Sequence, residues 1–304
     1  MYTKTLVPLD GSPQSESVLP FAAAFASAFS TPVELFHVVE TDVANLERIA
    51  KTKQSGSLED ELTTTANSYL QRKAQMIPES LPVKFTVKIG KVADMIVEEA
   101  AADKGALVTM ATRGLSGAKR WLLGSVADKV LQAATNPLLL VKQSDEEEEG
   151  AKQYDLKELL VPLDGSLLAE SALPHAVAIA KSLGLKVTLF RVYEVPISVA
   201  TPLPYAPNAD RGTLDAMREE VENYLREKVS QLTTQGIKQA SHIAALGEAG
   251  QQIVDAAGQG KQTLIVMCTH GRSGIGRWFL GSVATRVAHH SSSPVLVVRA
   301  APPS

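Results

Sequence analysis

The sequence contains very little cysteine and no marked excess of charge of either sign. Cys268 is the only cysteine in 304 residues, which excludes an intrachain disulfide framework and a cysteine-rich zinc site and is typical of a reducing compartment. The net charge is −3, and the excess acid lies in the run at residues 145–149. Neither half of the chain therefore has the basic excess that binding to duplex nucleic acid requires.

Long hydrophobic runs are also lacking. The most apolar stretch, residues 18–29, is too short and too rich in alanine to span a bilayer. The first residues, MYTK, lead straight into a short apolar segment, without the hydrophobic region and cleavage site of a signal peptide. We therefore expect a cytoplasmic protein that does not insert into membranes.

What the sequence does have is an internal repeat that covers nearly the whole chain. The segment LVPLDGS at residues 6–12 recurs at residues 160–166, and WLLGSVA at residues 121–127 recurs as WFLGSVA at residues 278–284. A repeat of this length is the signature of a duplicated structural unit.

The length agrees with two domains, at about 150 residues per domain. We predict one domain at residues 1–143 and a second at residues 154–304. Residues 144–153, which contain the acidic run, are predicted to be a solvated linker.

Within each copy, short apolar segments alternate with longer amphipathic segments, a pattern that indicates crossover units around a parallel sheet. Strands are expected at residues 5–9, 33–39, 83–89, 106–110 and 138–141, and at 158–163, 187–193, 239–246, 263–268 and 295–298. Helices are expected at residues 13–29, 58–76, 92–103, 125–135, 167–183, 213–235, 250–258 and 282–291. The predicted fold class is α/β, with two tandem five-stranded parallel-sheet sandwiches. Ligands of such folds bind outside the carboxyl ends of the strands, where the strand order reverses.

Two repeated motifs lie at these strand ends. The first is Pro-Leu-Asp-Gly-Ser, in which Asp10 and Asp164 can accept hydrogen bonds from a ribose or position a metal-bound water. The glycine permits a tight turn, and the serine is a natural helix N-cap. The alternative interpretation, a plain strand-to-helix turn, stays open.

The second motif follows the fourth strand of each copy. It reads ATRG, nine residues and Gly124-Ser125 in the first half, and CTHG, nine residues and Gly281-Ser282 in the second. Both Gly-Ser pairs open a predicted helix, where unpaired backbone N–H groups and the helix dipole favour an anion. The motif predicts a phosphate-binding loop, and a glycine turn before a capped helix is the alternative.

With these motifs the chain resembles a tandem universal stress protein, in which two copies of the family domain form one polypeptide. The family motif is glycine, two residues, glycine, nine residues, glycine and then serine or threonine. Both halves keep the second glycine, the nine-residue spacing and the final Gly-Ser, but Ala111 and Cys268 replace the first glycine. In the nucleotide-binding branch of the family that glycine lies against the ribose and phosphates, so a β-carbon there crowds the ligand.

The resemblance implies a Rossmann-like fold of the adenine-nucleotide alpha-hydrolase type, which binds ATP, or AMP or ADP, with Mg²⁺ as the accompanying cation. The implied nucleotide-binding residues of the first half are Pro8, Leu9, Asp10, Val38, Ala111, Thr112, Arg113, Gly114, Gly117, Gly124, Ser125 and Val126. Those of the second half are Pro162, Leu163, Asp164, Val192, Cys268, Thr269, His270, Gly271, Gly274, Gly281, Ser282 and Val283. No catalytic residue is implied, and the six histidines show no metal-ligand spacing, so no metal site built from protein ligands alone is expected.

Three functions are compatible with these residues: a nucleotide-dependent switch in a stress response, a slow ATPase, and a nucleotide-free interaction scaffold. Fast hydrolysis would need a general base and added positive charge at the γ-phosphate, and no such repeated feature is seen. The last strands, residues 138–141 and 295–298, are hydrophobic edges. By resemblance they pair with each other in an intramolecular pseudo-dimer, and a homodimer of the whole chain is a further expectation.

Overall fold

The computed structural model describes seven stretches of the chain, namely residues 1–40, 55–112, 123–142, 155–194, 211–258, 262–269 and 280–299. The chain divides into two compact units, Met1–Tyr154 and Asp155–Ser304. The predicted acidic linker at residues 144–153 lies outside the described residues, so its boundaries stay a prediction.

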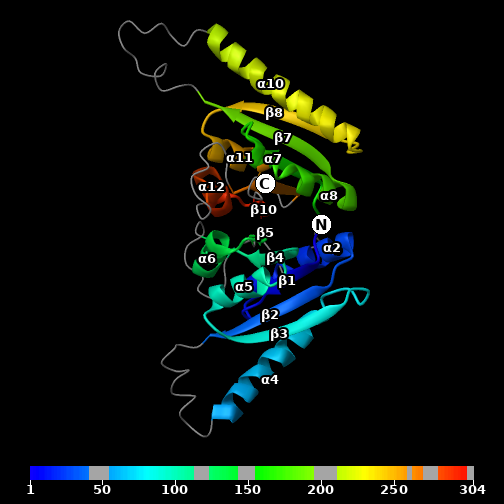
Figure 1. Ribbon diagram of the computed structural model, residues 1–304, viewed down its shortest axis with the longest axis vertical. Helices are drawn as coiled ribbons and strands as arrows, with labels where there is room; N and C mark the ends of the chain where they lie inside the picture. Colours follow the sequence, from blue (N-terminus) through cyan, green and yellow to red (C-terminus); the bar gives the residue numbers. More distant parts are fainter. Residues whose placement is uncertain are drawn as a thin grey trace, which may run out of the picture. The chain divides into compact units, whose positions relative to one another are not determined.

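The first unit is an α/β sandwich around one parallel sheet (Figure 1). Its elements are β1 (Lys4–Pro8), α1 (Pro13–Glu16), α2 (Leu19–Phe29), β2 (Val33–Glu40), α4 (Ser55–Ala74), β3 (Val83–Gly90), α5 (Val92–Ala101), β4 (Ala106–Ala111), α6 (Ser125–Ala133) and β5 (Leu138–Val141). The strand order is β3-β2-β1-β4-β5, and every pair is parallel.

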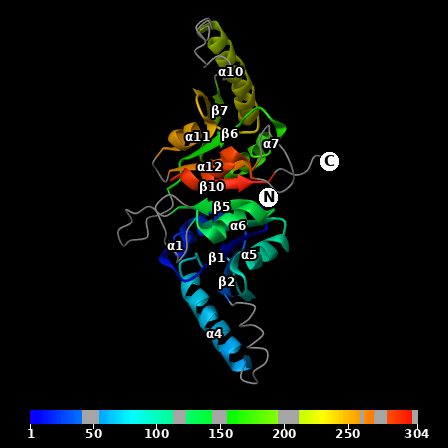
Figure 2. The same ribbon diagram turned by 90° about the vertical axis from the view of Figure 1, so that its left-hand side faces the viewer.

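The second unit repeats this arrangement. Its elements are β6 (Glu158–Pro162), α7 (Leu167–Glu170), α8 (Leu173–Leu183), β7 (Lys186–Tyr193), α10 (Arg211–Thr234), β8 (Ala240–Leu246), α11 (Ala249–Ala257), β9 (Thr263–Cys268), α12 (Ser282–His290) and β10 (Val295–Val298). The strand order is β8-β7-β6-β9-β10, again all parallel. Helix α10 has 24 residues and packs along β7 and β8. Figure 2 shows it next to β7. The prediction of two five-stranded parallel-sheet sandwiches is confirmed.

The core lies on both faces of the central strands. All six residues of β4 are buried, as are Leu6 and Val7 of β1, because helices cover both faces of a doubly wound sheet. Such strands read as continuous apolar runs, which is why the sequence located them to within a residue or two. Among the described residues, no helix is long and apolar enough to cross a membrane.

The prediction of one continuous helix at residues 13–29 was wrong, and so was that at residues 167–183. Helix α1 ends at Glu16 and α2 begins at Leu19, with a proline in its first turn. In an unbroken helix the ring of Pro20 would clash with the carbonyl of Glu16, four residues earlier, and would remove one hydrogen bond. Pro174 and Glu170 stand in the same relation between α7 and α8. The break leaves each glutamate at the end of a short separate helix.

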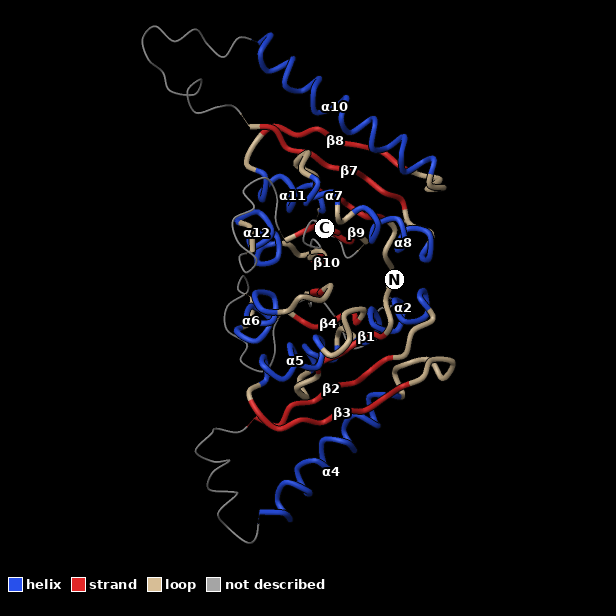
Figure 3. Tube along the Cα trace, in the orientation of Figure 1, coloured by secondary structure: helices blue, strands red, loops and turns tan. Residues whose placement is uncertain are grey.

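The strand order reverses beside β1 in the first unit and beside β6 in the second. Strand β1 lies between β2 and β4, and the chain then continues outward to β5. Because the strands are parallel, their carboxyl ends meet at one edge of each sheet (Figure 3). The described residues of both repeated motifs lie at that edge.

Candidate functional site

The turn after β1 is built around the side chain of Asp10. Its Oδ1 accepts hydrogen bonds from the backbone N–H of Ser12, at 2.9 Å, and from the Ser12 hydroxyl. Gly11 has φ +87°, a left-handed conformation that favours glycine. The Ser12 Oγ then accepts from the amide of Ser15, at 3.1 Å, and caps α1. The predicted N-cap is confirmed, and part of the Asp10 carboxylate shapes the turn itself.

The second unit forms the same turn from the same residue types. Asp164 Oδ1 accepts from the amide of Ser166 at 2.9 Å, Gly165 also has φ +87°, and Ser166 Oγ accepts from the amide of Ala169 at 3.1 Å. A carboxylate has about four acceptor positions, so each aspartate can hold its turn and still accept from a ligand hydroxyl.

The backbone of the second strand extends past the end of the first. Pro8 pairs with Phe36, and the Phe36 carbonyl accepts from the amide of Leu9 at 2.8 Å. Alternate residues of a strand direct their N–H and C=O groups to the same side. Those of Val38 therefore point toward the space beyond the end of β1, as the adenine contact implied by the resemblance requires.

In the second unit, Pro162 pairs with Phe190, whose carbonyl accepts from the amide of Leu163 at 2.8 Å. Val192 is two residues further along β7 and so has the backbone direction of Val38.

The fourth strand and the following helix are joined by their backbones. The amide of Thr112 continues the ladder to Val141, at 2.9 Å, while its carbonyl accepts from the amide of Gly124, at 2.7 Å. Gly124 is the N-cap of α6 and supplies no side-chain cap. Ser125 is the first helical residue, its side chain is exposed, and Val126 follows it. The N-terminus of α6 therefore presents amide groups at the sheet edge without a capping side chain.

The second unit repeats this geometry at Thr269, Gly281 and Ser282. The amide of Thr269 donates to the Val298 carbonyl at 3.0 Å, and the amide of Gly281 donates to the Thr269 carbonyl at 2.8 Å. Gly281 is the N-cap of α12, again without a side-chain cap, and Val283 is the second residue of the helix. The serines of the Gly-Ser pairs thus occupy the first helical position, and neither is the N-cap residue.

The two residues that replace the first motif glycine are buried. Ala111 ends β4 and is 8% exposed, and Cys268 ends β9 and is 6% exposed. The Cys268 Sγ lies 3.9 Å from Oγ of Ser171, at the end of α7. Its side chain therefore contacts the helix layer. The other six predicted residues of this motif lie outside the described residues: Arg113, Gly114, Gly117, His270, Gly271 and Gly274.

A polar cluster that the sequence reasoning missed lies beside the β1 turn. Tyr69 and Lys73, one turn apart on α4, both reach Glu16: the tyrosine hydroxyl donates to Oε1 at 3.0 Å and the lysine Nζ to Oε2 at 2.6 Å. Burial raises the pKa of Tyr69, and the Glu16 carboxylate raises it further, so its hydroxyl stays a donor at neutral pH. The cluster fixes α4 against α1.

The second unit carries the same cluster. Tyr224 donates to Glu170 Oε1 at 2.8 Å and Lys228 donates to Oε2 at 2.7 Å. A signal was present in the sequence, since Tyr-Leu-x-x-Lys occurs in both helices, at residues 69–73 and 224–228.

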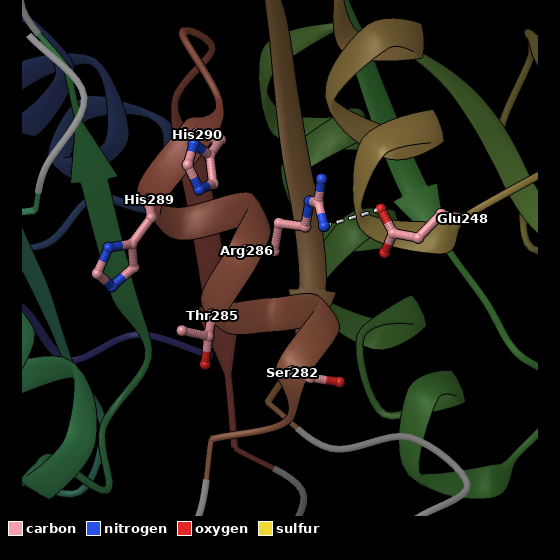
Figure 4. A pocket seen from close by; sticks show the side chains of 6 residues that line it. All are labelled: Glu248, Ser282, Thr285, Arg286, His289 and His290. Atoms are coloured by element: carbon pink, nitrogen blue, oxygen red, sulfur yellow. Dashed lines mark ion pairs between the residues drawn. The ribbon is translucent and has the colours of Figure 1, made fainter.

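An open pocket of about 460 Å³ follows the exposed face of α12 (Figure 4). It is lined by Glu248, Ser282, Thr285, Arg286, His289 and His290. Arg286 points across it to Glu248, the N-cap of α11, with Nη1 and Oε2 3.3 Å apart. Only Ser282 belongs to the predicted site, so the candidate site is located by the sheet edge and not by this pocket.

Comparison with known proteins assigns both units to the same family. Residues 1–142 and 156–299 each match the profile of the universal stress protein family. A universal stress protein of Mycolicibacterium smegmatis is 26% identical over 299 residues, which are 97% of this chain and 96% of the relative. One from Methanocaldococcus jannaschii is 34% identical over 143 residues, 47% of this chain and 82% of the relative. The crystal structure of a universal stress protein from Archaeoglobus fulgidus has a TM-score of 0.66 at 20% identity, covering 97% of this chain and 98% of the other.

Proposed function

Since this chain belongs to the universal stress protein family, we propose that it binds an adenine nucleotide at the carboxyl edge of the sheet in one or both units and acts as a nucleotide-dependent switch in a stress response. The observation that carries the proposal is the N-terminus of α6. It lacks a side-chain cap, is joined to the end of β4 by the Gly124–Thr112 hydrogen bond, and starts with an exposed serine. Amide groups and the helix dipole favour phosphate at such a position.

The remaining parts of the edge suit a nucleoside. Asp10 can accept from ribose hydroxyls, and the backbone of Val38 can exchange hydrogen bonds with the edge of an adenine ring. The described residues contain no group of three or more histidine, cysteine or acidic side chains that could hold a metal ion. Mg²⁺ would therefore be bound chiefly by the phosphate oxygens, where it would neutralise their charge. ATP is the first ligand to test, with ADP and AMP beside it.

The test is titration of the purified chain with ATP and Mg²⁺ by isothermal calorimetry, with the number of bound nucleotides counted by native mass spectrometry. Gly124→Asp places a carboxylate where the phosphates are expected and should abolish binding in the first unit; Gly281→Asp does so in the second. Gly124→Asn has the same size without the charge and should lose much less affinity. The angles of Gly124, φ −64° and ψ 150°, are open to any residue, so both variants should fold.

Two outcomes would redirect the proposal. An unmodified chain that binds neither ATP, ADP nor AMP would favour the scaffold, in which the aspartate turns serve only the fold. Conversion of bound ATP to ADP in single-turnover conditions would favour the slow ATPase.

Assembly and location are proposals of the same kind. Strands β5 and β10 each pair with one neighbour inside their own unit. Their pairing with each other, a homodimer of the whole chain and a cytoplasmic location stay predictions from the sequence. Sedimentation at micromolar concentration would decide the homodimer, because a single species with the mass of one chain would exclude it.

A further inference from the structure

The two units carry different residues at one position of the second strand, beside the candidate site. The residue before Val38 on β2 is His37, whereas the residue before Val192 on β7 is Arg191. His37 is half-buried, and its Nδ1 donates to the carbonyl of Leu9 at 2.8 Å. Arg191 is 7% exposed, and its side chain contacts other groups than that of His37.

The Arg191 guanidinium lies flat against the turn after β6. A β-carbon placed on Gly165 would stand 3.1 Å from Cζ, Nη1 and Nη2 alike. On the other side the guanidinium carbon lies 4.8 Å from the centre of the Tyr224 ring, a cation–π contact. Arg191 is thus held between the glycine of the turn and the tyrosine of the Glu170 cluster.

Among the described residues of the first unit, no side chain takes the corresponding position over the turn glycine. A β-carbon on Gly11 would meet no described atom within 4 Å, although Gly11 has the same φ as Gly165. Tyr69 of the first unit corresponds to Tyr224 of the second. The His37 ring contacts Tyr69 edge-on and is hydrogen-bonded to Leu9, so it does not lie between Tyr69 and Gly11 as Arg191 lies between Tyr224 and Gly165. The position of a β-carbon on the turn glycine is therefore clear of described atoms in the first unit and faces the Arg191 guanidinium in the second.

Contacts on both sides of the guanidinium hold Arg191 in place. Glu170 binds Tyr224 and Lys228, and the charges of Arg191 and Asp164 both act on the Tyr224 hydroxyl. Moving the guanidinium away would break its stacking on Tyr224 and its packing over Gly165. Arg191 is consequently a poor candidate for a side chain that swings out to admit a ligand.

We propose that the two units are unequal, with the first unit binding the adenosine part of the nucleotide beside Gly11 and Arg191 excluding adenosine from the corresponding space in the second. The residue at this position, histidine or arginine, decides which unit binds. This inference rests on the proposed function, because it names the unit in which that function resides.

The test exchanges the two residues. We measure ATP–Mg²⁺ stoichiometry and affinity for the unmodified chain, His37→Arg and Arg191→His. The expected results are one nucleotide per chain, at least a roughly tenfold loss of affinity in His37→Arg, and a second bound nucleotide in Arg191→His. His37→Arg should fold, because the second unit already accommodates arginine between an equivalent glycine and tyrosine.

A readout without substitution locates the ligand. Hydrogen exchange of the unmodified chain should show nucleotide-dependent protection in peptides covering residues 4–16 and little change in residues 158–170. The proposal that the units are unequal would be overturned by two equal sites, by protection of residues 158–170, or by unaltered binding in His37→Arg. Each of these outcomes would leave the proposed nucleotide binding intact. No binding to the unmodified chain or to Arg191→His would instead reject the proposed function and the inference together.

Discussion

The amide of Gly124 donates a hydrogen bond to the carbonyl of Thr112, with N and O 2.7 Å apart, and Gly281 and Thr269 form the same bond at 2.8 Å. Each bond joins the start of a helix to the end of a central strand. It places the helix N-terminus at the edge where the strand order reverses. Because both partners are backbone atoms, the contact is independent of which side chains flank it.

The N-cap of α6 offers a stability prediction. Gly124→Asp supplies the side-chain cap that the helix lacks and places a negative charge at its N-terminus, so the free energy of unfolding should rise by a few tenths to about 1 kcal/mol. Urea unfolding without nucleotide measures this. Gly124→Ala adds a side chain that cannot cap, and should give no such gain. A destabilised Gly124→Asp protein would show that the backbone at this position needs glycine.

The two turn glycines form a matched pair. Alanine at either position is strained by φ +87°, at a cost of about 1 kcal/mol. At Gly165 the new β-carbon must also displace the Arg191 guanidinium, whereas at Gly11 no described atom lies within 4 Å of it. Gly165→Ala should therefore lower the unfolding temperature more than Gly11→Ala does. Equal losses would mean that Arg191 does not pack against the turn.

The lowered pKa of Glu34 predicts how the stability of the first unit depends on pH. Its side chain is 3% exposed; burial raises its pKa, but hydrogen bonds from Lys4, Lys84 and Thr86 outweigh this and lower it to about 2. Since the folded pKa lies below the ordinary value, the stabilisation is complete above about pH 4.5 and is lost as the pH falls toward 2.

Glu34→Gln should remove stability on the order of 3 kcal/mol at pH 7 and flatten the acid limb of the unfolding curve. The measurement is the urea midpoint between pH 7 and pH 2.5. Glu98→Gln is the control, because that side chain is 64% exposed and its pair with Lys88 contributes little. Parallel acid limbs for the unmodified chain and Glu34→Gln would contradict the prediction.

The Glu16 cluster should couple α1 to α4. A double-mutant cycle with Glu16→Gln and Lys73→Met should give a coupling energy of roughly 1 kcal/mol, since both side chains are largely buried and their charged atoms are 2.6 Å apart. The Glu170→Gln and Lys228→Met cycle, at 2.7 Å, should match it. Additive single effects would show that the tyrosine hydroxyls alone hold the glutamates.

The inner strands could be located from the sequence because nearly all their residues are buried. Residues 138–141, 263–268 and 295–298 match the observed strands β5, β9 and β10 end to end. The helix boundaries were harder to predict. The apolar spacing of residues 13–29 continues across Pro20, and α1 is separated from α2 because the proline ring would clash with the carbonyl of Glu16.

The aspartate turns and the Gly-Ser helix starts could be placed from repetition, because short motifs at strand ends do not depend on distant contacts. The Glu16–Tyr69–Lys73 cluster could not, since it joins residues more than 50 positions apart. Tyr-Leu-x-x-Lys recurs in the sequence, but nothing local shows that these side chains reach a glutamate.

The sequence by itself determined the duplication, the alternation of strands and helices, and the family, because each rests on local pattern and burial. The tertiary structure decided how two nearly identical motifs differ in their surroundings. His37 and Arg191 occupy the same position in the repeat, yet one bonds to a carbonyl and the other fills the space over a glycine. The physical reason is that the short imidazole reaches only the carbonyl of Leu9, just after the neighbouring strand, whereas the longer guanidinium reaches the ring of Tyr224 on α10.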